Sequence, residues 1–386
     1  MKRLAIITTH PIQYYAPVFK LLQERGNIGI HVFYTWSQAA YKKFDPGFDK
    51  EISWDIPLLE GYDFSWVSNT AKNPGSHHFN GIKNPGLLSA IRSYGADAIL
   101  VFGWAYQSHL RALRHFHGRI PVFFRGDSTL LDRSSILKSA LRKIWLTWVY
   151  RHVDTVFYVG ENSRNYFKSF GLKDHQLIRA SHAVDNIRFS ADHSAEAEKI
   201  RGEKGIPASD TVVLFAGKFE PKKNPELLLA CFLRLSLKNT HLIFAGNGIL
   251  KPRLRELAAQ QTKHVHFLPF QNQGRMPALY QASDLFCLPS GGPAETWGLA
   301  VNEAMACSKA VLASDKVGAA ADLVHPGENG DIFRSGDTAD LTKKLENLLS
   351  DTAKLKKMGL AGRRIISSFT FTRIAEAIEK RMNNEQ

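Results

Sequence analysis

The chain has 386 residues, of which 44% are hydrophobic and 11% aromatic, so it is long enough for two domains that each bury a substantial core. This composition excludes a disordered or low-complexity protein. The formal charge is +14, and residues 1–190 hold most of the excess, with 24 Lys and Arg against 14 Asp and Glu.

The positive charge favours nucleic acid, an anionic membrane or a phosphate-bearing acceptor as a partner. No nucleic-acid-binding motif accompanies the charge, so we do not expect nucleic acid as a partner. Three cysteines stand at unrelated spacings among apolar residues: Cys231, Cys287 and Cys307. They predict buried structural thiols in a reducing compartment rather than disulfides or a metal site.

The N-terminal apolar run, Leu4–Ile7, ends too early for a signal peptide and reads as a first strand. No segment reaches the roughly 18–20 apolar residues of a membrane span. We therefore expect a cytoplasmic protein, either free or peripheral at the inner face of the plasma membrane.

Short apolar runs alternate with amphipathic stretches along the first half of the chain. The predicted strands are Leu4–Thr8, Ile30–Tyr34, Ala98–Phe102, Pro121–Arg125 and Thr155–Val159. The predicted helices are Ala16–Glu24, Ala105–His117, Ser135–Arg151 and Glu161–Phe170. The long segment Tyr41–Pro85 lacks this pattern, and it is either a loop that shapes an acceptor site or an ordinary insertion.

The second half repeats the alternation. Its predicted strands are Val212–Ala216, His241–Ala245, Val265–Leu268, Leu285–Leu288 and Ala310–Ala313. Its predicted helices are Pro225–Leu237, Lys251–Gln261, Gly298–Cys307 and, at the C-terminus, Thr370–Met382. Such alternation predicts parallel sheets joined by right-handed crossovers. We therefore expect an α/β chain with two doubly wound Rossmann-like domains that face each other across a cleft.

The apolar pattern lapses near residues 185–194, which predicts a first domain over 1–188 and a second over 189–369. The polar stretch Ala191–Gly205 is interpreted as a linker that runs into the second domain. In open α/β sheets, ligands bind beyond the carboxyl ends of the strands. The cleft between the two domains is therefore the expected site.

The strongest motif is Glu295-Thr-Trp-Gly-Leu-Ala-Val-Asn-Glu303, which follows a strand and a glycine loop. A helix predicted to start near Trp297 puts Glu295 just before its N-terminus and Glu303 about two turns inside it. The backbone amides of Trp297, Gly298 and Leu299 would then form an anion site for a diphosphate.

Two further motifs follow strands and precede helices. The first is Phe215–Pro225, in which Lys218 and Lys223 can converge on a phosphate pair while Gly217 lets the backbone approach closely. A solvated basic turn is the alternative. The second, Gly246-Asn247-Gly248, resembles half a dinucleotide fingerprint but has Lys251 at the place of the third glycine. It indicates a tight turn rather than an NAD site.

Together these segments, over Val212–Leu341, resemble the donor domain of retaining glycosyltransferase family 4, the bacterial group 1 glycosyltransferases of GT-B fold. The resemblance implies that Lys218 and Lys223 neutralise the donor diphosphate and that Glu303 hydrogen-bonds the ribose. It implies further that Glu295 faces the transferred sugar or its phosphate, with Gly217, Gly246, Asn247 and the Trp297–Leu299 backbone among the donor contacts. Lys218 replaces the usual Arg of the family, and Asn224 replaces a usual Gly.

The first half resembles a bacterial branch of the same family through His10–Tyr15, Phe102–Trp104, Arg125–Ser128 and Val184–Asn186. Four residues there fall at predicted strand ends and are expected to contact the acceptor or to line the cleft: His10, Gln13, Arg125 and Asp127. A local turn or cap role is the alternative for His10. The resemblance also implies that the C-terminal helix, within residues 370–386, packs back on the first domain.

The implied activity is transfer of a hexosyl group, with retention, from a nucleoside-diphosphate sugar in the second domain to a glycan or lipid-linked acceptor in the first. The implied pathway is bacterial cell-surface polysaccharide synthesis. No Asp-x-Asp pair and no ligand set with metal spacing occurs, so we expect neither a metal nor a cofactor besides the nucleotide-sugar co-substrate. A nucleotide-sugar epimerase of GT-B fold and a non-catalytic nucleotide-sugar-binding protein stay open as alternatives.

The segment Lys138–Arg151 mixes basic residues with Trp145 and Trp148. Two interpretations stay open for it. It is either a helix that lies on an anionic membrane near a lipid-linked acceptor or a partly buried helix of the first domain.

Overall fold

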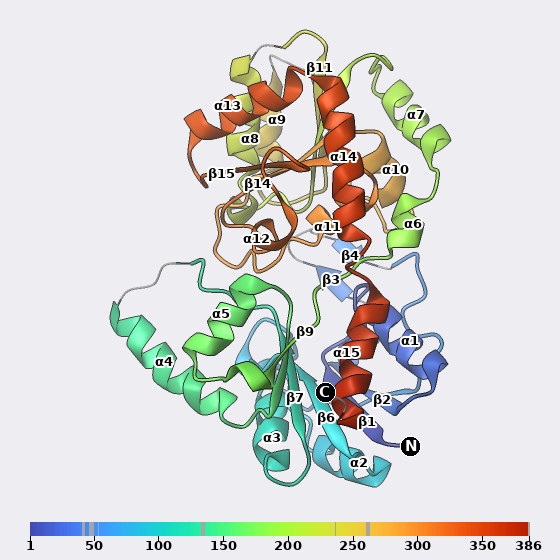
Figure 1. Ribbon diagram of the computed structural model, residues 1–386, viewed down its shortest axis with the longest axis vertical. Coiled ribbons are helices and arrows are strands. Elements are labelled where there is room, and N and C mark those ends of the chain that lie inside the picture. The colour runs from blue at the N-terminus through green and yellow to red at the C-terminus, as the bar shows by residue number, and fades with distance from the viewer. Residues whose placement is uncertain are drawn as a thin grey trace. The chain divides into compact units, whose positions relative to one another are not determined.

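The computed structural model describes residues 1–40, 43–45, 50–52, 54–132, 136–235, 237–259 and 263–384. The chain divides into two units, each built around its own parallel sheet (Figure 1). The first unit consists of Met1–Lys43, Ile56–His182 and Phe371–Gln386, and the second of Phe44–Asp55 and Ala183–Thr370. The predicted α/β class with two Rossmann-like domains is confirmed.

The first unit contains a seven-stranded sheet in the order β5-β2-β1-β6-β7-β8-β9, in which all neighbours are parallel. Its strands are β1 (Arg3–Thr8), β2 (Gly29–Tyr34), β5 (Phe64–Trp66), β6 (Ala98–Phe102), β7 (Val122–Gly126), β8 (Thr155–Tyr158) and β9 (Leu177–Arg179). The five predicted strands are confirmed, whereas the three-residue edge strands β5 and β9 were not predicted. The central strand β1 is buried on both faces, as parallel sheets require, and therefore reads as a continuous apolar run.

Helices cover both faces of this sheet. On one face, side chains such as Ile7, Val101 and Phe124 form a core with four helices. These helices are α2 (Leu87–Tyr94), α3 (Gln107–Phe116), α4 (Ile136–Tyr150) and α5 (Glu161–Ser169). On the other face lie α1 (Ala16–Arg25) and the last helix, α15 (Phe371–Asn383), which pack against each other. Arg25 and Glu379 join these two helices through a bidentate ion pair with Nη2–Oε2 and Nε–Oε1 distances of 2.9 Å.

The second unit contains a six-stranded parallel sheet in the order β12-β11-β10-β13-β14-β15. Its strands are β10 (Thr211–Ala216), β11 (Thr240–Ala245), β12 (Val265–Leu268), β13 (Leu285–Leu288), β14 (Ala310–Ser314) and β15 (Gly330–Phe333). One face packs on α8 (Pro225–Leu235), α9 (Lys251–Ala258), α13 (Thr338–Leu349) and α14 (Thr352–Ile366). The unit also contains the helices α6 (Asn186–Ser190), α7 (Ser194–Glu203), α10 (Met276–Gln281), α11 (Ala300–Ala306) and α12 (Ala320–Leu323).

Two predictions for this unit were wrong. The stretch Ala191–Gly205 is no linker, because its residues Ser194–Glu203 form α7. Most residues of this helix are polar, and it buries only Ala197 and Ile200, one helical turn apart. Two apolar positions are too few to show a helical period in the sequence. The helix predicted over Gly298–Cys307 is shorter and starts two residues later, at Ala300.

The segment predicted to be irregular, Tyr41–Pro85, lies partly outside the described residues. Its described part contains β5, a 3-10 turn at Phe79–Gly81 and the two-stranded sheet of β3 (Lys43–Asp45) and β4 (Lys50–Ile52). The three cysteines are free and buried, as predicted. Among the described residues, no helix combines the length and the apolar character that crossing a bilayer requires.

Candidate functional site

The candidate site of the second unit lies at the carboxyl ends of three adjacent strands. Because β10 lies between β11 and β13, the residues that directly follow these strands meet at one edge of the sheet. Lys218 follows β10, Asn247 follows β11, and Glu295 belongs to the loop after β13. The structure thus gathers residues that lie up to 77 positions apart in the sequence.

The closest charged pair at this edge joins Lys223 and Glu295. Lys223 Nζ lies 2.5 Å from Glu295 Oε2, and the two side chains are 19% and 8% exposed. Ser290, in the loop that follows β13, donates its hydroxyl to the same oxygen at 2.9 Å. Two donors on one oxygen fix the orientation of the Glu295 side chain.

The local backbone explains how Lys223 is presented. Residues Pro221–Lys223 form a 3-10 turn that ends at Asn224, whose φ is 51°. Asn is among the few residues that tolerate this left-handed conformation, so the replacement of the usual glycine at 224 preserves the turn. Pro225 then opens α8, where its missing N–H costs no hydrogen bond.

Glu303 is the second carboxylate, and it is 3% exposed. It lies in the first turn of α11, so the predicted depth of two turns was wrong because the helix starts at Ala300. Tyr280, on α10, donates its hydroxyl to Glu303 Oε2 at 2.8 Å. Tyr280 was not predicted as a site residue, because its apolar surroundings in α10 resemble an ordinary core position.

Trp297, Gly298 and Leu299 form the turn that precedes α11 rather than its first residues. The Trp297 side chain is buried and donates Nε1–H to Asn302 Oδ1 at 2.8 Å, so it has a structural contact of its own. Gly298 adopts a φ of 93°, which a residue with a Cβ rarely does. Two backbone hydrogen bonds fix the segment from Glu295 to Trp297. The Gly318 amide donates to the Glu295 carbonyl at 3.1 Å, and the Ala319 amide donates to the Trp297 carbonyl at 2.8 Å.

The glycine loops after β10 and β11 are packed directly on each other. A Cβ at Gly246 would lie 1.9 Å from the carbonyl oxygen of Gly217, and both glycines have a positive φ, 146° and 155°. The Phe219 amide donates to the Asn247 carbonyl at 2.8 Å, which extends the strand pairing into the loops. The backbone itself therefore forms the floor of this edge, as the tight-turn interpretation predicted.

The predicted residues of the first unit also lie at carboxyl ends of strands. His10 and Gln13 follow β1, and Arg125 and Asp127 lie at and just after the end of β7. β6 separates these two strands, so the two pairs are near neighbours at one edge of the sheet. His10 Nδ1 is 2.9 Å from Thr9 Oγ1, and its ring meets Trp36 edge-on at a centroid distance of 5.5 Å.

Arg125 has an unusual environment, because the residue is 2% exposed and its guanidinium is only partly hydrogen-bonded. Nη1 donates to the Ala180 carbonyl at 2.8 Å, whereas Nε and Nη2 have no hydrogen-bond partner in the described part of the chain. The guanidinium carbon lies 5.6 Å from the centre of the Tyr15 ring. A buried arginine with two unused donor groups is a strong candidate to bind an anion or a hydroxyl-rich ligand.

Two neighbours of Arg125 were missed by the sequence analysis. Tyr15 stacks on His182 at 5.9 Å, and His182 Nε2 lies 3.8 Å from Asp127 Oδ2. Burial raises the pKa of Tyr15 to about 12 and lowers the pKa of His182, so both rings are neutral near pH 7. His182 follows the short strand β9, which was not predicted, and for this reason its position at the sheet edge gave no signal.

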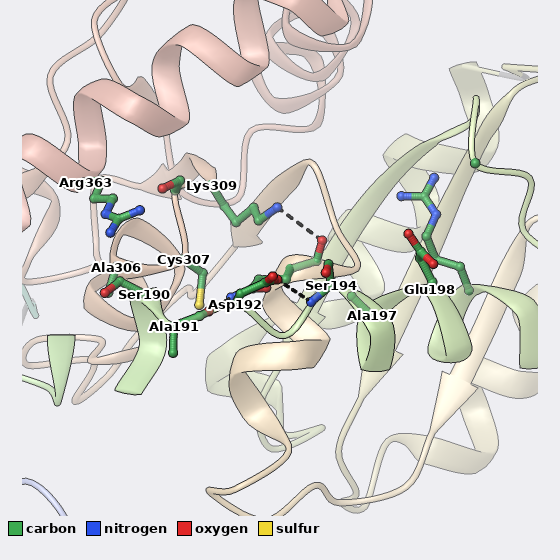
Figure 2. Close-up of a pocket in the computed structure, with 14 residues that line it drawn as sticks. Ser190, Ala191, Asp192, Ser194, Ala197, Glu198, Ala306, Cys307, Lys309 and Arg363 are labelled. Carbon is green, nitrogen blue, oxygen red and sulfur yellow. Dashed lines mark hydrogen bonds between the residues drawn. The ribbon is translucent and has the colours of Figure 1, made fainter. Parts of the chain in front are cut away.

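A separate hollow in the second unit, with a cavity volume of about 520 Å³, contains none of the predicted site residues (Figure 2). It lies near the amino end of β14, since Lys309 directly precedes that strand. Lys309 Nζ donates to the Gln281 carbonyl at 3.2 Å. Cations and carboxylates line this hollow together: Arg201, Lys309 and Arg363 accompany Asp192 and Glu198. Within the described residues, no group of three potential ligands is placed to hold a metal ion.

Residues 196–365 match the family described as glycosyl transferases group 1. D-inositol 3-phosphate glycosyltransferase from Nocardia farcinica (strain IFM 10152) is 30% identical over 229 residues, which is 56% of this chain and 49% of that protein. Putative glycosyltransferase EpsD from Bacillus subtilis (strain 168) is 26% identical over 253 residues, or 62% of this chain and 64% of that protein. The chain thus spans about half the length of the first of these curated relatives.

Solved structures match over the whole chain. Sucrose-phosphate synthase from Thermosynechococcus elongatus has a TM-score of 0.75 at 18% identity and covers 100% of this chain and 99% of its own. Anabaena Alr3699/HepE, solved with UDP, has a TM-score of 0.75 at 19% identity with full coverage of both chains. These likenesses show the fold, and the predicted GT-B class is confirmed. The predicted resemblance to the group 1 glycosyltransferases is confirmed for the matched region.

Proposed function

We propose that this chain, whose second unit carries the glycosyl transferases group 1 region, is a glycosyltransferase that uses a nucleoside-diphosphate sugar. The observation that carries the proposal is the Lys223–Glu295 pair beside Lys218 at the carboxyl ends of β10 and β13, with the buried Glu303 nearby in sequence. Solved HepE binds UDP and UDP-glucose, and a Mycolicibacterium smegmatis relative, 27% identical, is named a GDP-mannose-dependent mannosyltransferase. Both support a nucleoside diphosphate as the carrier of the sugar.

In this proposal each donor contact has a chemical role. Lys218 and Lys223 neutralise the diphosphate, and Lys223 has two further N–H donors beyond the one directed at Glu295. Glu303 accepts from the ribose hydroxyls in an orientation fixed by Tyr280. The glycine loops at Gly217, Gly246 and Asn247 and the Trp297–Leu299 turn let backbone amides approach the phosphates.

The proposed transfer retains the anomeric configuration and uses no metal. The bond between C1 of the sugar and the phosphate oxygen breaks, and its electron pair leaves with the diphosphate. The acceptor hydroxyl forms the new C1–O bond on the same face and gives its proton to a phosphate oxygen. The lysines stabilise the charge that develops on the leaving group. Glu295 orients the sugar, because Lys223 and Ser290 already occupy its Oε2.

The acceptor is proposed to be a glycan or a lipid-linked sugar of bacterial cell-surface polysaccharide synthesis, bound by the first unit. Arg125 supports this role through its two unused, buried donor groups. His10, Gln13 and Asp127 are proposed as further contacts with the acceptor. A hydroxyl-rich or anionic acceptor would satisfy Nε and Nη2 of Arg125, which otherwise stay desolvated without a partner.

A peripheral membrane contact is proposed for α4. Leu141, Ile144 and Trp145 are 62%, 71% and 43% exposed, and Arg142 and Lys143 are exposed between them. Apolar side chains flanked by cations favour the surface of an anionic bilayer. Replacing Leu141 and Ile144 with Ser should reduce sedimentation with phosphatidylglycerol vesicles severalfold. The change Leu360→Ser removes an equally exposed apolar side chain from α14 and should have no effect.

The function is tested by the release of nucleoside diphosphate from a panel of UDP- and GDP-sugars, with and without candidate acceptors. Lys223→Ala should lower turnover roughly 100-fold or more, because it removes a cation from the leaving group. Lys222→Ala is the matched control, since Lys222 is the adjacent lysine and pairs with Glu220 at 3.6 Å instead. Near-normal turnover of the Lys223 variant would contradict the assignment. Donor conversion without any acceptor would favour an epimerase, and binding without conversion a non-catalytic protein.

A further inference from the structure

The first unit has a hollow of its own, with a cavity volume of about 620 Å³, and arginine side chains line it. Four arginines line it, Arg92, Arg111, Arg114 and Arg119, together with His115 and His152. They come from α2, from α3, and from the turns that precede β7 and β8.

The topology of the sheet explains why these residues meet. Arg92, Arg119 and His152 stand shortly before β6, β7 and β8, which are adjacent and parallel. Their amino ends therefore meet at one edge of the sheet. The proposed acceptor contacts, such as Arg125, lie at the carboxyl edge, roughly 15 Å away along five-residue strands. The arginine hollow is thus separate from the site discussed above.

The charge in this hollow is not balanced. No acidic residue lines it, and none of the four arginines forms an ion pair with a carboxylate of the described residues. Asp97 and Asp154, which directly precede β6 and β8, accept instead from the backbone amides of Arg3 and Val122, at 2.7 and 2.8 Å. The hollow of the second unit differs, because carboxylates accompany its cations.

Neutral groups hold three of the arginines in place. Arg92 Nη1 lies 3.3 Å from His115 Nε2, and Arg119 donates to the His115 carbonyl. The Arg114 guanidinium lies 5.3 Å from the centre of the Trp148 ring. Burial, followed by the charges of three arginines, lowers the pKa of His115, so its neutral ring can accept from Arg92. These contacts orient the guanidinium groups and leave their charge uncompensated.

A simpler explanation accounts for only part of the cluster. Arginines in the last turn of a helix interact favourably with the helix dipole, and Arg92 and Arg114 occupy such positions in α2 and α3. Arg111 lies in the middle of α3, and Arg119 lies in the turn after it. The positive charges of these arginines repel one another, and a bound anion would offset that repulsion.

We propose that the arginine hollow binds a ligand that carries phosphate groups. Guanidinium groups match phosphate oxygens in bidentate geometry. Four guanidinium groups around one hollow suit either a ligand with more than one phosphate group or a ligand with a single terminal phosphate, that is, a phosphate monoester. The ligand is either a free oligophosphate or the headgroup of a phospholipid. This site is distinct from the proposed donor site and goes beyond the proposed transfer reaction.

The first measurement is calorimetric titration of the full chain with inorganic pyrophosphate. The titration is made in a Lys218→Ala/Lys223→Ala background, so that the proposed donor site contributes little to the binding that remains. Arg92→Gln/Arg119→Gln should then weaken binding at least tenfold. The control Arg253→Gln/Arg334→Gln removes two exposed arginines of the second unit, 53% and 75% exposed, and should leave binding unchanged.

The second measurement distinguishes the sources of the phosphate. Vesicles of phosphatidylcholine with and without phosphatidic acid are sedimented with the same variants. Binding that needs both phosphatidic acid and the two arginines identifies a lipid headgroup, whereas pyrophosphate binding alone identifies a free ligand. Equal behaviour of the hollow and control variants in both measurements overturns the proposal. Should the double variant melt well below the control, Arg111→Gln, an exposed single change, replaces it with the same expectations.

Discussion

At the scale of single residues, Tyr280 connects packing to the proposed donor site. Its hydroxyl donates to the buried Glu303 at 2.8 Å, and hydrogen bonds to charged groups are worth about 1.5–3 kcal/mol. Tyr280→Phe should therefore weaken nucleotide-sugar binding by roughly tenfold or more, with a smaller effect on turnover. Equilibrium binding and steady-state kinetics check this split. Tyr166→Phe, a buried tyrosine of the first unit, serves as the control and should bind normally.

His109 is a residue whose protonation links stability to pH. It is fully buried, its Nδ1 lies 2.9 Å from the Gly103 carbonyl and its Nε2 2.8 Å from Thr35 Oγ1. Burial lowers its pKa from 6.5 to about 4. Between these values the unfolded chain binds the proton and the folded chain does not. Its contribution is complete above pH 6.5 and is lost on acidification towards pH 4, by up to about 3 kcal/mol.

Urea unfolding at several pH values tests this expectation. In His109→Gln, the free energy of unfolding should depend less on pH between 4 and 6.5 than in the wild type, although the variant is less stable at neutral pH. His117→Gln changes an exposed histidine and should keep the wild-type slope. An unchanged slope in the His109 variant would mean that other groups dominate the acid response.

At the scale of elements, the packing of the glycine loops after β10 and β11 on each other contributes to the stability of the second unit. Gly246→Ala places a methyl group 1.9 Å from the Gly217 carbonyl oxygen on a backbone with a φ of 146°. We expect a loss of roughly 2–4 kcal/mol in the free energy of unfolding. The control Gly202→Ala, in the helix α7 with no atom within 4 Å, should be neutral or slightly stabilising. Thermal melting of the two variants gives the comparison, and equal Tm values would contradict it.

The elements also show where sequence patterns were sufficient. Buried central strands such as β1 and β10 are continuous apolar runs and were predicted to within a residue. The edge strand β9 has three residues with partial exposure, and α7 buries only two side chains. Neither element therefore shows a recognisable periodicity of apolar residues in the sequence. For the candidate site, motifs after strands predicted Lys223 and Glu295. Their mutual pairing, the Tyr280 contact and the His182 neighbour depend on tertiary packing that spacing alone does not encode.

At the scale of the whole molecule, the chain returns to the first unit near its C-terminus, because α14 belongs to the second unit and α15 to the first. A chain that ends at Thr370 lacks α15, which buries Ile374, Ala375, Ile378 and Met382 in the first unit and pairs Glu379 with Arg25. This loss should lower the stability of the first unit and leave the second unit, which keeps its sheet and core, unaffected. Calorimetric melting should therefore separate into an early transition, assignable to the first unit by hydrogen exchange of β1, and a late one near the wild-type Tm.

A chain that ends at Asn383 keeps the helix and should melt like the full chain. If truncation at Thr370 instead lowered both transitions equally, the stability of the second unit would have to depend on α15, a helix of the first unit.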